Sequence, residues 1–172
     1  MKVFISHSVG KAELRFVHHL SASLTGAEVP NYLALHDRQP GVRLSEKVKS
    51  HIESSQVLIA LLTRKGNQSS WVHDEIGYAL GKGLKVFAFV EKSLKLDGMH
   101  AGAEYLTFDP TDPSSDIAAL SERLARQRAE AEAASARELA ANAQAQADVA
   151  TIFAIAFLCV AVVALLLLAA RR

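Results

Sequence analysis

The chain has 172 residues, enough for one domain of ordinary size and an additional segment. Its 19 basic and 18 acidic residues give a formal net charge of +1, so nothing in the charge balance favours nucleic-acid binding. The single cysteine, Cys159, excludes a disulfide framework and a Cys/His zinc pattern. The seven histidines show no metal-ligand spacing, so no metal is expected.

Strands and helices are predicted to alternate through the first two-thirds of the chain. Short apolar or β-rich runs predict strands, and apolar residues recurring at helical spacing predict helices. The predicted strands are 2–6, 32–35, 57–62, 85–90 and 104–108. The predicted helices are 10–24, 44–54, one capped by Ser70 and closed by 81–83, and one that begins near Asp116. This alternation predicts an α/β fold with an open parallel sheet covered on both faces, and the flavodoxin-like order 2-1-3-4-5 is the simplest topology.

One acidic residue in the helix that follows the third predicted strand has a notable position. Glu75 lies near the start of this helix, between the apolar residues Val72 and Ile76, which are expected to face the sheet. A helix that follows a strand of a parallel sheet begins at the carboxyl edge, where ligands bind. The segment 6–8, which ends the first strand, is expected at the same edge. Position alone favours a simpler role for Glu75, in which the acid complements the helix dipole.

The segment 117–147 is rich in alanine, arginine, glutamate and glutamine and contains neither glycine nor proline. Its composition predicts a helix. Leu120 and Leu124 are expected to pack on the domain. Beyond them Leu139 is the only large apolar residue, and sustained heptads are absent, so a solvated helical stalk is predicted.

The segment 149–170 is apolar or small throughout, with Thr151 as its only polar residue. As a helix its length of about 22 residues matches the thickness of a bilayer core, so a single transmembrane helix is predicted. Arg171 and Arg172 favour the inside of a membrane. The N-terminal residues form a strand pattern and not a signal peptide, which instead favours a tail anchor with the domain on the cytoplasmic side.

Four segments in order resemble the TIR (Toll/interleukin-1 receptor) domain of the prokaryotic type. Residues 3–8, VFISHS, resemble the first strand and its end. Asp37 with Pro40 and Gly41 resembles the BB loop. Residues 53–63 resemble the end of the second helix with the third strand, and WVHDEI at 71–76 resembles the WVxxEI segment. The resemblance implies the TIR fold over residues 1–115 and does not cover the rest of the chain. Composition and length, as described above, predict the final domain helix with its stalk over 116–147 and the membrane helix with the terminal arginine pair over 148–172.

The resemblance also implies a chemistry. Many TIR domains cleave NAD at the nicotinamide–ribose bond, giving nicotinamide and ADP-ribose or a cyclic variant, and Glu75 matches their catalytic glutamate. NAD is then a substrate, and no cofactor is expected. A carboxylate is suited to the positive charge that builds on the ribose as nicotinamide leaves. Further residues implied to contact substrate are Ser6, His7, Ser8, Asp37 and Trp71. The implied BB loop, which gates the site and joins TIR domains, comprises Asp37, Arg38, Gln39, Pro40 and Gly41.

Two other functions remain open. The chain is alternatively a non-catalytic TIR–TIR interaction module that recruits other TIR proteins or further copies of itself to membrane lipid. A nucleoside deoxyribosyltransferase-like enzyme also has a related fold and uses a glutamate. For the enzyme, a role in bacterial defence signalling is the context that the resemblance suggests.

Overall fold

The computed structural model describes residues 1–8, 10–33, 45–94 and 103–169, without the side chains of 11, 12, 103 and 159–169. The chain divides into two compact units, Met1–Arg128 and Ala129–Arg172. The first unit contains the sheet and the helices that cover it. The second consists of the later part of one long helix.

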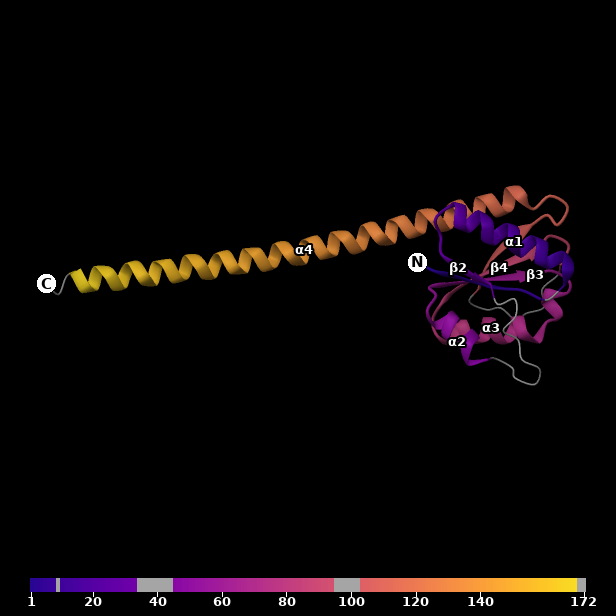
Figure 1. The fold of residues 1–172 in the computed structure, drawn as a ribbon, viewed down its shortest axis with the longest axis horizontal. Helices are drawn as coiled ribbons and strands as arrows, with labels where there is room; N and C mark the ends of the chain where they lie inside the picture. Colours follow the sequence, from indigo (N-terminus) through magenta and orange to yellow (C-terminus); the bar gives the residue numbers. More distant parts are fainter. Residues whose placement is uncertain (9, 34–44, 95–102, 170–172) are drawn as a thin grey trace. The chain divides into compact units, whose positions relative to one another are not determined.

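Five parallel strands form the sheet in the order β2-β1-β3-β4-β5, which confirms the predicted topology (Figure 1). The strands are β1 (Val3–Ser6), β2 (Asn31–Leu33), β3 (Val57–Leu62), β4 (Lys85–Glu91) and β5 (Ala103–Phe108). All four residues of β1 and all six of β3 are buried. This burial is expected of inner strands that are covered by helices on both faces.

The helices are α1 (Lys11–Gly26), α2 (Glu46–Glu53), α3 (Ser70–Gly81) and α4 (Ser114–Ala169), with a short 3-10 helix η1 (Gly66–Gln68) before α3. Ser69 is the N-cap of α3, one residue earlier than predicted, and its side chain makes no capping hydrogen bond. The sequence did not indicate η1, because three residues are too few to show a helical period.

Alternate residues along each strand face opposite helical layers, because successive side chains of a strand point to opposite faces. Val3 and Ile5 of β1 belong to the core cluster that includes residues of α1 and α4. Phe4 belongs to the cluster that includes residues of α2 and α3. As predicted, α4 contributes Leu120 and Leu124 to the first cluster. Ser6 has the same parity as Phe4 and therefore faces α3.

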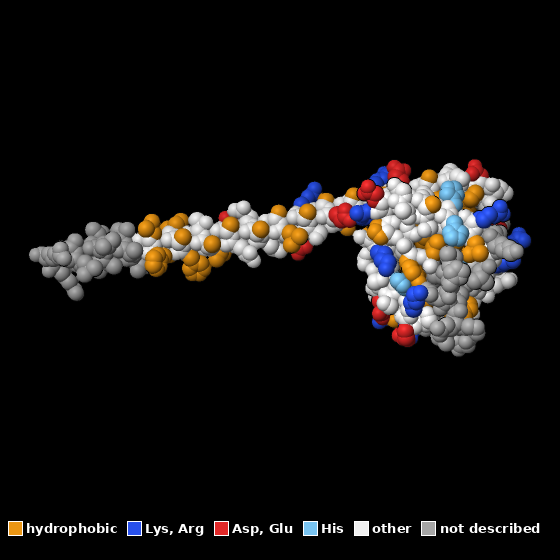
Figure 2. All heavy atoms as spheres, viewed as in Figure 1, with side chains coloured by type: hydrophobic (Ala, Val, Ile, Leu, Met, Phe, Trp, Pro, Cys, Tyr) orange, Lys and Arg blue, Asp and Glu red, His pale blue; other side chains and the backbone are white. Residues whose placement is uncertain are grey.

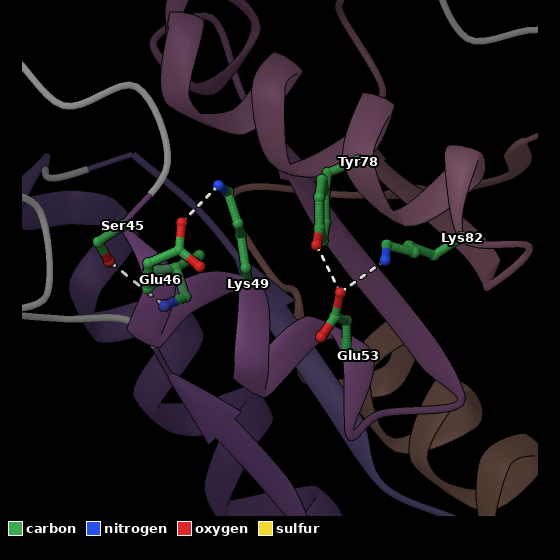
Figure 3. Close-up of polar contacts among 7 residues, drawn as sticks. Ser45, Glu46, Lys49, Glu53, Tyr78 and Lys82 are labelled. Carbon is green, nitrogen blue, oxygen red and sulfur yellow. Dashed lines mark hydrogen bonds and ion pairs between the residues drawn. The ribbon is translucent and has the colours of Figure 1, made fainter.

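Polar contacts join α2 to α3 on the outside of the second layer (Figure 3). Glu53, at the end of α2, accepts a hydrogen bond from the Tyr78 hydroxyl at 2.6 Å and pairs with Lys82 at 2.7 Å. The Lys82 ammonium and the Tyr78 hydroxyl hold the pKa of Glu53 below its ordinary value. At the other end of α2, the Ser45 hydroxyl accepts from the backbone N–H of Val48 at 3.3 Å. The contacts of Glu53 hold α3 beside α2, and the Ser45 cap stabilises the start of α2.

The predicted membrane anchor is contradicted by α4. Every side chain described from 129 to 158 is exposed, and the large apolar ones occur from Val149 onwards, apart from Leu139 (Figure 2). Among the described residues, no helix is both long and apolar enough to cross a membrane. This finding corrects the expected single-pass anchor and the membrane localisation derived from it.

Candidate functional site

Glu75 of α3 and Ser6 of β1 form a buried pair at the carboxyl end of the inner strands. The Ser6 hydroxyl donates to Glu75 Oε2 at 2.5 Å, across 69 positions of sequence. Ser6 is fully buried and Glu75 is 1% exposed. A carboxylate with this little exposure is rare in a protein interior unless other groups satisfy it. The Ser6 hydroxyl is one such group, and it fixes the direction of the carboxylate.

Small side chains cross the sheet in line with Ser6. In the strand register Ser6 is paired with Ala60 of β3, and Ala60 with Ala88 of β4. Both alanines are fully buried in the layer that contains α3. Large residues at these positions would push α3 away from the sheet. The alanines leave room for α3 to place the Glu75 side chain against the end of β1.

His7 and Ser8 continue the chain from Ser6 and are also buried, at 1% and 7% exposure. The His7 Nδ1 lies 2.6 Å from the carbonyl oxygen of Ser8. Because a carbonyl oxygen only accepts, Nδ1 carries the proton in this contact. Ser6, His7 and Ser8 thus lie together beneath the surface at the end of β1, and the Ser6 hydroxyl donates to Glu75.

Other predicted site residues have different environments. Trp71 lies in the first turn of α3 and is half-buried. The predicted BB loop, which comprises Asp37, Arg38, Gln39, Pro40 and Gly41, lies outside the described residues. Tyr78, on the same helix as Trp71, donates to Glu53 of α2. We therefore assign Tyr78 to the contact between the two helices.

A second buried carboxylate, Glu13 in the first turn of α1, was missed in the sequence. It is 4% exposed and accepts hydrogen bonds from the Thr63 hydroxyl and from the backbone N–H of Gly66, the latter at 3.1 Å. Its position resembles that of Glu75, because each glutamate lies near the start of a helix and binds a hydroxyl at or just beyond the end of a strand. An acidic residue soon after the end of the first strand was the signal that could have identified it.

The geometry at Glu75 is suited to stabilising positive charge on a substrate. A carboxylate held at a fixed position in a site with little water interacts strongly with a developing cation. The described residues contain no group of three or more histidine, cysteine or acidic side chains arranged to hold a metal.

A model of the TIR domain family matches residues 3–125. No curated protein matches the chain significantly. The described fold is similar to that of a CMP N-glycosidase from Clostridium botulinum, BcmB, with 18% identity and a TM-score of 0.52, covering 70% of this chain and 98% of that one. At this identity the likeness concerns the fold alone.

Two further solved structures are more distant. One is the heterodimer of the RPS4 and RRS1 TIR domains, with 18% identity, a TM-score of 0.49, and coverage of 76% of this chain and 97% of that one. The other is a 2-deoxyribosyltransferase from Bacillus psychrosaccharolyticus, with 14% identity, a TM-score of 0.49, and coverage of 69% of this chain and 90% of that one.

Proposed function

This chain belongs to the TIR domain family, and from that premise we propose that it cleaves NAD at the nicotinamide–ribose bond, with Glu75 as the catalytic carboxylate. The observation that carries the proposal is the buried hydrogen bond from Ser6 to Glu75. A carboxylate that only complements a helix dipole gains nothing from burial, because a solvated acid serves the same purpose. Its burial at the ligand-binding edge of the sheet instead favours a chemical role.

In the proposed reaction, the bond between ribose C1′ and the nicotinamide nitrogen breaks, and both of its electrons leave with nicotinamide. Positive charge develops on the ribose, and the Glu75 carboxylate stabilises it. Water then attacks C1′ and releases one proton, giving ADP-ribose; attack by a group within the same molecule gives a cyclic product. The bond cleaved is N-glycosidic, and the fold neighbour described as a CMP N-glycosidase makes this class of chemistry compatible with the fold.

Ser6 has a positioning role in this proposal. Its hydroxyl holds Oε2 of Glu75 and so fixes the orientation of the carboxylate toward the ribose in the proposed reaction. His7 and Ser8 are proposed to shape the adjacent wall, and Trp71 to provide a flat surface for an aromatic base. Residues 37–41 are retained as the proposed BB loop. The proposed extents also remain 1–115 for the TIR domain and 116–147 for the final helix with its stalk.

The burial of Glu75 has a consequence for activity. With 1% exposure, its carboxylate is inaccessible to a molecule the size of NAD until neighbouring residues move. We propose that self-association supplies this rearrangement, so turnover per chain rises with protein density. Other TIR domains are the alternative partners for the same step.

Nicotinamide release by the purified full chain, followed by chromatography over a range of protein densities, tests the proposal. The wild type is expected to release nicotinamide, and Glu75→Gln to lose activity by about 100-fold or more. Asp74→Asn is the matched control, because it removes the neighbouring carboxylate of the same helix and is expected to retain activity. Release that persists in Glu75→Gln would remove Glu75 from its catalytic role.

The inaccessibility of the Glu75 carboxylate in the structure supports one alternative, a TIR–TIR interaction module without turnover. In that role the Ser6–Glu75 pair serves only to hold α3 on the sheet. Absence of nicotinamide release at every density, together with self-association measured by light scattering, would establish this alternative. Release from the wild type would exclude it.

A further inference from the structure

A second candidate site lies on the opposite side of the sheet from Glu75. A cavity of about 550 Å³ opens where α1 begins and where β3, β4 and β5 end, and its lining includes Gly10, Glu13 and Phe108. Glu75 is not part of this lining. The volume is within the range of about 300–1,000 Å³ found for small-molecule pockets. The carboxyl edge of a parallel sheet is also where such ligands bind in this class of fold.

One wall of the cavity is aromatic. The rings of Phe16, from α1, and Phe108, from the end of β5, have centroids 4.6 Å apart. Phe108 is 1% exposed and Phe16 is half-buried, so Phe108 holds the pair in the core and Phe16 provides the accessible aromatic face of the cavity. Pro110 and Pro113 extend the apolar surface beyond β5. A flat, apolar ring is the ligand group that suits such a wall.

A rigid acceptor lies in the same cavity. Glu13 is held there by the Thr63 hydroxyl and the Gly66 N–H. A Cβ atom at Gly66 would lie 2.5 Å from the carbonyl oxygen of Leu61, so only glycine lets the chain pass close enough to make this contact. The Glu13 carboxylate is thereby preorganised to accept hydrogen bonds from ligand hydroxyl or amino groups.

Positive charge borders the cavity. Arg15, Arg64 and Lys65 line it and are exposed, and none of the three makes an ion pair within the described part of the chain. The N-terminus of α1 also lies at the cavity, and its N-cap residue, Gly10, has no side chain to cap the helix. Helix N-termini and clustered cations both attract anions. The carboxylates in the lining, Glu13 and Glu91, are fewer than these cations.

From these three features together we infer that this cavity is a binding site for a nucleoside monophosphate, separate from the site at Glu75. The base lies against Phe16, which Phe108 supports from the core; the ribose hydroxyls donate to Glu13, and the phosphate lies among Arg64, Lys65 and the start of α1. A free phosphate can bind only the cations and the start of α1, and a nucleoside can bind only the aromatic wall and Glu13. The inference does not depend on NAD cleavage.

Titration of the full chain with AMP, followed by calorimetry, tests the inference. Saturable binding is expected, with adenosine and inorganic phosphate each binding at least 10-fold more weakly. His19→Trp places a bulky side chain at the cavity lining and is expected to weaken AMP binding by at least 10-fold. His18→Trp is the matched control, because His18 is the adjacent exposed residue of α1 and is not in the lining; its affinity is expected to be unchanged.

Two more variants locate the ligand. The double variant Arg64→Ala, Lys65→Ala is expected to weaken AMP binding by at least 10-fold and to leave adenosine binding unchanged. Glu75→Gln is expected to bind AMP as the wild type does, whether or not it has lost NAD cleavage. The inference is overturned by an absence of saturable binding at millimolar AMP, by unchanged affinity in His19→Trp and in the double variant, or by loss of binding in Glu75→Gln.

Discussion

The hydrogen bond between Ser6 and Glu75 is predicted to contribute measurably to the stability of this TIR domain. Both side chains are buried, their oxygens are 2.5 Å apart, and the acceptor is a carboxylate. Hydrogen bonds to charged groups contribute about 1.5–3 kcal/mol, which is more than neutral ones do. We therefore expect Ser6→Ala to lower the free energy of unfolding by about 2 kcal/mol.

A double-mutant cycle separates this bond from the other contacts of the two residues. Ser6→Ala, Glu75→Ala and the double variant are compared with the wild type by urea unfolding of the full chain. Trp71 is the only tryptophan and lies in α3, so its fluorescence reports on the unfolding of this region. The expected coupling energy is about 1.5–3 kcal/mol. The urea dependence must stay the same among the variants for the comparison to hold.

Ser8→Ala is the matched control for the cycle. Ser8 is also buried, two residues further on, and among the described residues its hydroxyl makes no hydrogen bond. Its replacement is expected to change the free energy of unfolding by less than about 0.5 kcal/mol, since no bond is lost. A coupling energy below about 0.5 kcal/mol between Ser6 and Glu75 would refute the reasoning, because it would mean that the bond does not hold the carboxylate.

Three further predictions concern other parts of the domain. Gly66→Ala is expected to destabilise the domain by about 1–3 kcal/mol, because the added Cβ meets the backbone. Gly77→Ala, where the added Cβ points into open space on α3, is expected to stabilise the domain by about 0.5–1 kcal/mol. Equal shifts of the melting temperature in the two variants would contradict this reasoning. Ser45→Ala removes the N-cap of α2 and is expected to cost about 1 kcal/mol in urea unfolding. Glu53 has a folded pKa below its ordinary value of 4.5, chiefly because of Lys82, so its contribution is present above that value and is lost as the pH falls through the folded pKa. The stability difference between the wild type and Glu53→Gln is therefore expected to be constant near neutral pH and to vanish in acid, and a difference that grows in acid would reverse the assignment.

Local patterns in the sequence were sufficient for the order of the elements and for placing Glu75 at the carboxyl edge of the sheet, whereas the catalytic role proposed for Glu75 came from the resemblance to the TIR domain. Apolar runs identified the five strands, because a strand covered on both faces is apolar throughout, as in β3. Alternation of strands and helices, with right-handed connections, then left few topologies, and the observed order is the simplest of them. Glu75 lies near the start of a helix after a strand, which by itself places it at the carboxyl edge.

The sequence pattern gave the wrong expectation for the last segment. The apolar composition of 149–170 predicted a membrane helix, yet the described helices include none that meets the requirements for crossing a membrane. The helix itself was predicted correctly, because alanine-rich sequence without glycine or proline favours it.

Only the tertiary structure decided which side chains meet. Ser6 and Glu75 are 69 positions apart, and Glu13 is 50 positions from Thr63. A local pattern states which face of an element is apolar, but the pairing of distant residues depends on strand register and on how closely each helix approaches the sheet. The alanines at 60 and 88 set that approach for α3, and Gly66 sets it for the loop beside α1. Hydrophobic periodicity therefore determined the architecture, while close packing between distant segments brought Glu75 to Ser6 and formed the cavity beside Glu13.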